Sequence, residues 1–234
     1  MPNWLKHWSR RRRGQPWGFV AFRAACRDDE ARWEEFKLEV QRIINIQFER
    51  VSKPESKPPD FEEARENFEI RWIEDDTTIS LNADAFRSKY AELRPNLPSG
   101  LSQELFICAT PESVDSVLAV KTSNRPTADS AWWRSNAPFL VAVTADSDPG
   151  LEEGHEERSW FQPAFKVAIE SMVEELWWLI DSDMMPLRRV TRYTKGHGEL
   201  GVAGLNDSDG LEDIWWTIAP SPERLQKRRQ LRRT

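Results

Sequence analysis

The sequence predicts a mixed α+β fold in which helices pack on one face of a mainly antiparallel sheet, in a ferredoxin-like arrangement. Apolar runs of strand length alternate with amphipathic runs of helix length along the chain. The sequence has no long series of strand–helix–strand units with glycine-rich turns, which would favour a parallel sheet. The twelve tryptophans among 234 residues indicate a folded core rather than a disordered chain.

The first predicted elements are a strand and a long helix. The apolar run PWGFVAFRAA is bounded by Gly and Pro and predicts a buried strand over 17–24. Apolar residues then recur every three or four positions, and Asp28 is placed to cap, so an amphipathic helix is predicted over 28–51. Three prolines in SKPESKPPD interrupt this pattern and predict a surface linker.

The later elements repeat the alternation. FEEARENFEIRWIEDD is predicted as a helix followed by a strand, NADAFRSKYAEL as a short helix, and PESVDSVLAV as a further helix. Strands are predicted at 104–110, 138–145 and 163–169, in one sheet with 17–24. The last strand is expected to lead into the helix SMVEELWWLID; one helix throughout 164–181 is the competing interpretation.

The two ends of the chain are basic, and its centre is acidic. Residues 1–27 carry +7 and residues 220–234 carry +5, which leaves −18 on the residues between them in a chain of net charge −6. We divide the chain into a basic N-terminal segment (1–16), one α+β domain (17–219) and a basic C-terminal segment (220–234). Basic patches suit nucleic-acid phosphates, and solvated tails or a nuclear-localisation-like run are an equal alternative. The candidate nucleic-acid-binding residues are Arg10, Arg11, Arg12, Arg13, Lys227, Arg228, Arg229, Arg232 and Arg233.

Several classes of function lack their sequence signature here. The chain has no phosphate-binding glycine loop, no nucleophile elbow, no C-x-x-C and no H-E-x-x-H motif. Its three histidines have no partners at ligand spacing, so we expect no metal and no cofactor. No apolar run approaches the ~20 residues that span a bilayer, and the first residues do not form a signal peptide. The sequence therefore predicts a cytoplasmic protein with no membrane partner.

An acidic cluster follows the strand predicted at 138–145. Carboxylates at a strand end could grip a guanidinium group through charge-assisted hydrogen bonds, and a solvated acidic loop is the alternative. The substrate-binding candidates are Asp148, Glu152, Glu153 and, on the first strand, Arg23. The catalytic candidates are Asp146, Glu170 and Glu174. The last two lie four residues apart and could form an acid and base pair, although helix-surface glutamates are ordinary.

A family resemblance connects these features. The chain resembles a large group of uncharacterised ascomycete proteins in the stretches WGFVAFR, RWEEF, FEIRWIED, LFICATPESVDSVLA and WFQPAFKVAI with LWWLI. The fungal arginine-containing cyclodipeptide synthases are placed in or near that group. The similarity covers most of the chain, but its motifs are structural and no catalytic residue is carried over from them.

The resemblance implies an enzyme that joins arginine from arginyl-tRNA to a second amino acid as a diketopiperazine. Aminoacyl-tRNA would be the partner, with its phosphates on the basic ends and the arginine side chain on the acidic cluster. Two alternatives remain. One is a ferredoxin-like module that forms a homodimer or binds a protein through its Trp pairs, which are Trp132–Trp133, Trp177–Trp178 and Trp215–Trp216. The other is a nucleic-acid-binding protein without chemistry. The hypothesis of an enzyme predicts a deep pocket lined by acids, whereas the hypothesis of a binding module predicts a flat apolar face.

Overall fold

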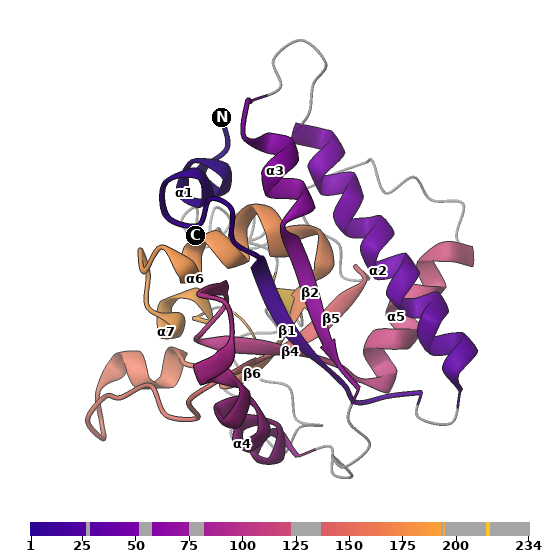
Figure 1. Ribbon diagram of the computed structural model, residues 1–234. Coiled ribbons are helices and arrows are strands. Elements are labelled where there is room, and N and C mark those ends of the chain that lie inside the picture. The colour runs from indigo at the N-terminus through magenta and orange to yellow at the C-terminus, as the bar shows by residue number, and fades with distance from the viewer. Residues whose placement is uncertain are drawn as a thin grey trace, which may run out of the picture.

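The strands form one mixed sheet in which a single strand runs against the others (Figure 1). The structure, a computed structural model, describes residues 1–26, 29–51, 58–74, 82–122, 137–192, 194 and 214–215. The strands in this part of the chain are β1 (Trp17–Arg23), β2 (Phe68–Ile73), β3 (Gly100–Leu101), β4 (Leu105–Ala109), β5 (Phe139–Thr144), β6 (Ala164–Ala168) and β7 (Ile214–Trp215). Their order is β2-β1-β4-β5-β6-β7, and β3 also pairs with β1. Of these strands, only β5 is antiparallel to its neighbours.

The prediction of a mainly antiparallel sheet is therefore wrong, and the ferredoxin-like arrangement is not confirmed. The broader prediction of a mixed fold with one sheet and several helices is confirmed. Strands β1, β2 and β4 pair in parallel because helix-containing crossovers join them. Glycine-rich turns serve the close approach of a phosphate, so their absence did not exclude parallel pairing.

Helices cover both faces of the sheet, which also corrects the expectation of one covered face. The helices are α1 (Asn3–Arg11), α2 (Glu30–Val51), α3 (Phe61–Glu66), α4 (Ala83–Leu93), α5 (Pro111–Thr122), α6 (Trp178–Asp181) and α7 (Leu187–Val190), with 3₁₀ turns η1 (Arg94–Asn96), η2 (Glu156–Trp160) and η3 (Ile169–Ser171) and a π-helix η4 (Met172–Trp177). On one face, α2, α5 and η4 join the larger core. On the other, Phe86 and Tyr90 of α4 pack against Phe22 and Phe106.

The individual elements agree well with the sequence patterns. The four strands expected in one sheet correspond to β1, β4, β5 and β6, and the long amphipathic helix corresponds to α2. The segment predicted as a strand that leads into a helix is β6 followed by helical turns, although the π-helix η4 replaces the first part of the expected α-helix and α6 forms its last turn. The predicted cap Asp28 lies outside the described residues.

The basic N-terminal segment belongs to the core of the domain. Trp4, Leu5 and Trp8 are fully buried on one side of α1. The ring of Trp4 stacks on Trp17 with 5.3 Å between centroids, and Trp17 in turn contacts Trp177 at 4.4 Å. The basic N-terminal segment is therefore packed on the rest of the domain, because α1 covers part of the larger core.

The glycine after Trp17 is required by the close pairing of β1 with β2. Gly18 has a φ of 130°, and a Cβ atom at this position would lie 2.1 Å from the carbonyl oxygen of Glu69. Any side chain would therefore push the two backbones apart. This geometry explains the glycine in the WGF motif as a structural requirement.

Candidate functional site

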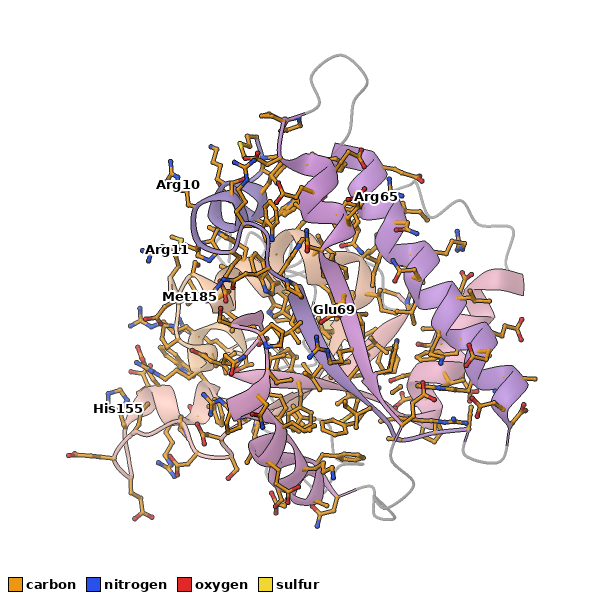
Figure 2. The ribbon with its side chains drawn as sticks, viewed as in Figure 1. Arg10, Arg11, Arg65, Glu69, His155 and Met185 are labelled. Atoms are coloured by element: carbon orange, nitrogen blue, oxygen red, sulfur yellow. The ribbon has the colours of Figure 1, made fainter. Side chains whose placement is uncertain are left out.

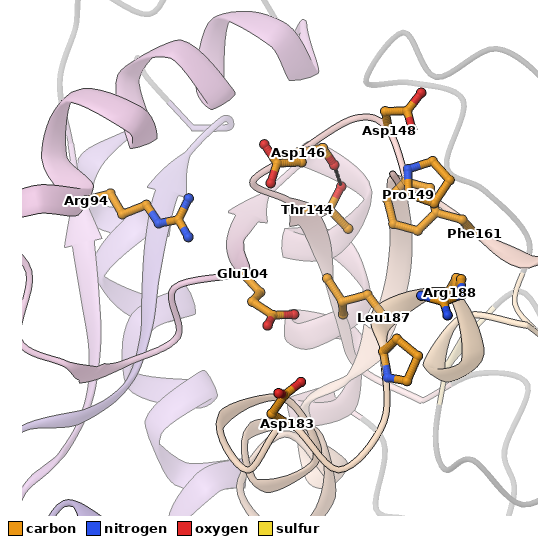
Figure 3. Close-up of a pocket in the computed structure, with 11 residues that line it drawn as sticks. Arg94, Glu104, Thr144, Asp146, Asp148, Pro149, Phe161, Asp183, Leu187 and Arg188 are labelled. Carbon is orange, nitrogen blue, oxygen red and sulfur yellow. Dashed lines mark hydrogen bonds between the residues drawn. The ribbon is translucent and has the colours of Figure 1, made fainter. Parts of the chain in front are cut away.

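An acidic pocket of about 300 Å³ lies where the end of β5 meets the start of β4 (Figure 3). The antiparallel register places Leu105 opposite Thr144, and the amide of Ala145 donates to the carbonyl of Glu104 at 2.8 Å. Figure 3 shows Glu104 in the middle of the labelled side chains, with Asp146 and Asp183 on either side. The lining residues are Arg94, Glu104, Thr144, Asp146, Asp148, Pro149, Phe161, Asp183, Pro186, Leu187 and Arg188.

Asp183 reaches the pocket because α6 ends in a left-handed turn. Asp183 has a φ of 51°, a conformation in which aspartate is tolerated better than most side chains. Its amide donates to the carbonyl of Ile180 at 3.1 Å, which closes the end of the helix. The chain then turns into α7 through Pro186, so the segment between the two helices forms one wall of the pocket.

The surroundings of Glu104 disfavour the charged form of its carboxyl group. Partial burial raises the pKa of the Glu104 carboxyl, and the nearby carboxylates of Asp183, Asp146 and Asp181 raise it further, whereas Arg94 lowers it. Asp183 has the larger effect among these acids, so the repulsion is strongest between Glu104 and Asp183. A cation between these two groups would relieve that repulsion.

The pocket is incompletely neutralised by the protein itself. Asp148 accepts hydrogen bonds from the amide of Gly150 and from Arg158, and both interactions lower the pKa of Asp148. Arg188 is paired with Glu157 at 2.7 Å. Within the described part of the chain, Glu104, Asp146 and Asp183 form no ion pair, and besides the paired Arg188 the pocket lining holds one further cation, Arg94. The site therefore has a surplus of negative charge.

The acidic cluster predicted from the sequence is only partly in this pocket. Asp146 and Asp148 line it, whereas Glu152 and Glu153 lie on the exposed loop that precedes η2. Asp148 already holds the guanidinium of Arg158, with its Oδ2 atom 2.6 Å from one nitrogen. Asp146 is thus the member of the predicted cluster that remains available to a ligand.

Glu170 and Glu174 lie at the opposite end of the sheet from Asp146. Glu170 follows β6, whose last residue pairs with the first residue of β5, whereas Asp146 follows the last residue of β5. The length of β5 separates these positions by ~17 Å. The two glutamates therefore share no concavity with Asp146, and the structure brings no acid and base pair of these residues together in the pocket.

Arg23, a predicted substrate-binding residue, is engaged within the fold. Its guanidinium contacts Glu30 at 2.7 Å and the ring of Trp33 at 4.9 Å, and it donates to the carbonyls of Ala25 and Cys26. Arg23 stands at the end of β4 that is remote from Glu104. These contacts indicate that it holds the loop after β1 rather than a ligand of the pocket.

The predicted basic residues divide into paired and unpaired groups. Arg12 binds both carboxylate oxygens of Asp181, and Arg13 lies 3.2 Å from Asp60. Arg10 and Arg11 are exposed at the end of α1, and among the described residues neither forms an ion pair (Figure 2). The C-terminal candidates Lys227, Arg228, Arg229, Arg232 and Arg233 lie outside the described residues.

The sequence reasoning missed Glu104, Asp183 and Arg94. Functional side chains gather at strand ends, and this tendency predicted Asp146, which follows β5; Glu104, which precedes β4, also stands at a strand end. Antiparallel pairing of β4 with β5 brings those two positions together, and the pairing was the missing information. Asp183 carried no signal, because its left-handed turn depends on where α6 ends.

This arrangement can bind a cation of side-chain size. Carboxylates lie at its centre, and Phe161, Pro149 and Leu187 supply an apolar wall for a methylene chain.

The described residues include no group of three or more His, Cys, Asp or Glu side chains placed to hold a metal ion. No helix in the described ranges has both the length and the apolarity to cross a membrane.

Comparison with known proteins adds no assignment to this geometry. No family model, no curated protein and no solved structure matches the chain. The pocket and the surface around it are therefore the features from which a function can be proposed.

Proposed function

We propose that the acidic pocket binds the guanidinium group of an arginyl residue carried by arginyl-tRNA, and that the protein joins this arginine to a second amino acid as a cyclic dipeptide. The observation that carries the proposal is the unneutralised group of carboxylates in a pocket with apolar walls. A volume of about 300 Å³ is at the lower end of the range for small-molecule sites.

Glu104 and Asp183 are the proposed guanidinium ligands. Each guanidinium can donate several hydrogen bonds from one planar fork, so it can satisfy two neighbouring carboxylates at once. The ligand would replace the repulsion between Glu104 and Asp183 by two attractive contacts. The aliphatic part of the arginine side chain would lie against Phe161 and Leu187.

Asp146 is the proposed proton acceptor. It lies on the exposed side of the pocket, and its backbone carbonyl accepts a hydrogen bond from the Thr144 hydroxyl, which fixes the turn (Figure 3). The amine of one aminoacyl group attacks the ester carbonyl of the other, a C–N bond forms, and the C–O bond to the ribose breaks. The proton that leaves the amine passes through the carboxylate to the ribose oxygen. A second attack of the same kind closes the ring.

The basic end of α1 supports a tRNA substrate. Arg12 bridges α1 to Asp181 of α6, two residues before Asp183 in the pocket. Arg10 and Arg11 therefore lie on the same side of the molecule as the segment between α6 and α7 (Figure 2). Phosphates near these arginines would place an attached aminoacyl group near the pocket.

The described tryptophans do not favour the alternative of a partner bound through Trp pairs. Trp177 and Trp215 are buried in the core, and Trp178 is half-buried. The large apolar side chains exposed in this part of the chain are Met1 before α1, Leu38 on α2 and Met184 between α6 and α7, so they come from three separate segments. Trp132, Trp133 and Trp216 lie outside the described residues.

The test is a reconstituted reaction. The purified protein is supplied with ATP, total tRNA, aminoacyl-tRNA synthetases and amino acids, and we expect mass spectrometry to detect an arginine-containing cyclic dipeptide that ribonuclease pretreatment abolishes. Glu104→Gln and Asp183→Asn should each lower the rate ~10- to 100-fold, as expected for the loss of a charged hydrogen bond. Glu153→Gln, on the exposed loop, makes the same charge change outside the pocket and should leave the rate unchanged.

The absence of product from fully charged tRNA pools would contradict the proposal. Binding of tRNA without product would then favour a nucleic-acid-binding protein without chemistry. Equal rates for Glu104→Gln, Asp183→Asn and wild type would instead place the arginine site elsewhere.

A further inference from the structure

A cation–aromatic stack stands beside the acidic pocket. The guanidinium carbon of Arg192 lies 3.7 Å from the centroid of the Trp160 ring. Trp160 is half-buried, whereas Arg192 is exposed. Phe161, the residue after Trp160, lines the pocket. Arg188, also in the pocket lining, lies about one helical turn before Arg192.

Buried hydrogen bonds hold the two members of the stack in place. The hydroxyl of Thr191 lies 3.0 Å from the carbonyl oxygen of Trp160 and accepts a hydrogen bond from the amide of Gln162 at 3.1 Å. Thr191 is fully buried, so the residues next to Trp160 and Arg192 are fixed to each other. A platform that is ordered before its ligand arrives has less conformational entropy to lose on binding.

Two further arginines lie close to the stack and share one carboxylate. Glu157 is shared by Arg188 and Arg189, at 2.7 Å and 2.6 Å, and hydrogen bonds from Arg189 and Arg188 lower the pKa of Glu157 to about 2. One carboxylate thus serves two guanidinium groups beside the stack of Arg192 on Trp160. A planar cationic surface with further cations beside it matches a planar base attached to phosphates.

We propose that Arg192 on Trp160 is a nucleobase platform that receives the last base of the unpaired 3′ end of an RNA strand. The base would stack on the exposed guanidinium of Arg192, and the phosphates would lie near Arg188 and Arg189. The inference rests on the proposed function in naming tRNA as that strand. A 3′ base at this position places the group esterified to its ribose at the mouth of the acidic pocket.

The extent of the basic surface favours a strand over a free nucleotide. Figure 2 shows Arg10, Arg11, Met185 and His155 in succession down one side of the molecule, and His155 caps the helix that ends at Trp160. The cations on α1 and α7 therefore lie on one side of the molecule and on two separate helices, as contacts with several phosphates of a strand would require (Figure 1 and Figure 2).

The experiment uses a short single-stranded RNA that ends in ACCA and carries 2-aminopurine as its last base. Stacking quenches the fluorescence of this base, and anisotropy of a 5′ label gives the dissociation constant. We expect quenching by the full-length protein and ~5- to 100-fold weaker binding by Arg192→Lys, which keeps the charge but loses the planar surface. Arg189→Ala removes a cation placed near the phosphates, so it should weaken binding irrespective of the 3′ base. Melting curves of the variants check that they fold.

Three results would each overturn the inference: equal affinity of Arg192→Lys and wild type, equal affinity for an RNA with an abasic 3′ residue, or competition by AMP at the concentrations at which the RNA binds. The last result would assign the stack to free nucleotides. Because the RNA carries no amino acid, this binding experiment and the cyclic dipeptide assay fail independently.

Discussion

Glu104 is a residue whose placement costs stability. Burial and the carboxylates of Asp183 and Asp146 disfavour its charged form, and Arg94 compensates only in part. Groups that are held charged against their surroundings are found preferentially at sites of function, because a ligand supplies the missing compensation. The same residue is therefore expected to reduce stability in the free protein and to increase affinity for a cation.

Glu104→Gln should stabilise the free protein at neutral pH. Because the folded-state pKa of Glu104 is raised above its ordinary value of 4.5, the charged form is disfavoured by folding at any pH above the folded pKa. The gain in unfolding free energy should be at most ~1 kcal/mol, since Glu104 keeps an exposed side. As the pH falls below 4.5 the group becomes protonated in both the folded and the unfolded state, so the gain should shrink towards zero.

Urea unfolding of Glu104→Gln and wild type between pH 4 and pH 8 measures this difference. Glu153→Gln, on the exposed loop, is the matched control. A loss of stability at pH 7 in Glu104→Gln alone would mean that the Glu104 charge is compensated by contacts other than Arg94.

At the scale of elements, α1 is attached to α6 through one carboxylate. Asp181 accepts hydrogen bonds from Arg12 at both oxygens and lies 2.7 Å from the Nε2 atom of His7. Its side chain is 6% exposed, so these partners replace most of the water it would have in the unfolded chain. This attachment connects the helix that bears Arg10 and Arg11 to the segment that carries Asp183.

Asp181→Asn should lower the free energy of unfolding by ~1.5–3 kcal/mol, the range for hydrogen bonds to a charged group. Hydrogen exchange should increase most in α1, because Arg12 and His7 lose their common partner. Asp148→Asn breaks a more exposed pair with Arg158 and should have a smaller effect. Unchanged exchange in α1 would show that Trp4, Leu5 and Trp8 suffice to hold the helix.

The elements were more predictable than their pairing. Periodicity identified β1, β4, β5, β6 and α2, because burial of one face imposes a local pattern on the sequence. The order and direction of strands depend on which side of β1 each crossover takes, and no local pattern records that choice. The pocket is equally hard to predict from local patterns. Asp146 could be predicted because it follows a strand, whereas Glu104 and Asp183 are brought into the pocket by tertiary contacts.

For the whole molecule, charge is segregated between an acidic body and basic ends. The first 27 residues carry +7, but Trp4, Leu5 and Trp8 in that segment are core residues. Deleting the segment would therefore confuse loss of charge with loss of folding. Substitution of its exposed arginines separates the two effects.

Arg10→Ala with Arg11→Ala should weaken tRNA binding and reduce its salt dependence. Each phosphate contact adds ~0.7–0.9 to the slope of log K against log salt concentration, so the double variant should lose ~1.4–1.8 if both residues contact phosphates. Both side chains are exposed, so the melting temperature should be unchanged. Arg65→Ala, on α3 and away from Arg10 and Arg11 in Figure 2, is the control and should leave the slope unaltered. Filter binding at several salt concentrations measures the slopes, and identical slopes for the double variant and wild type would remove α1 from the proposed tRNA surface.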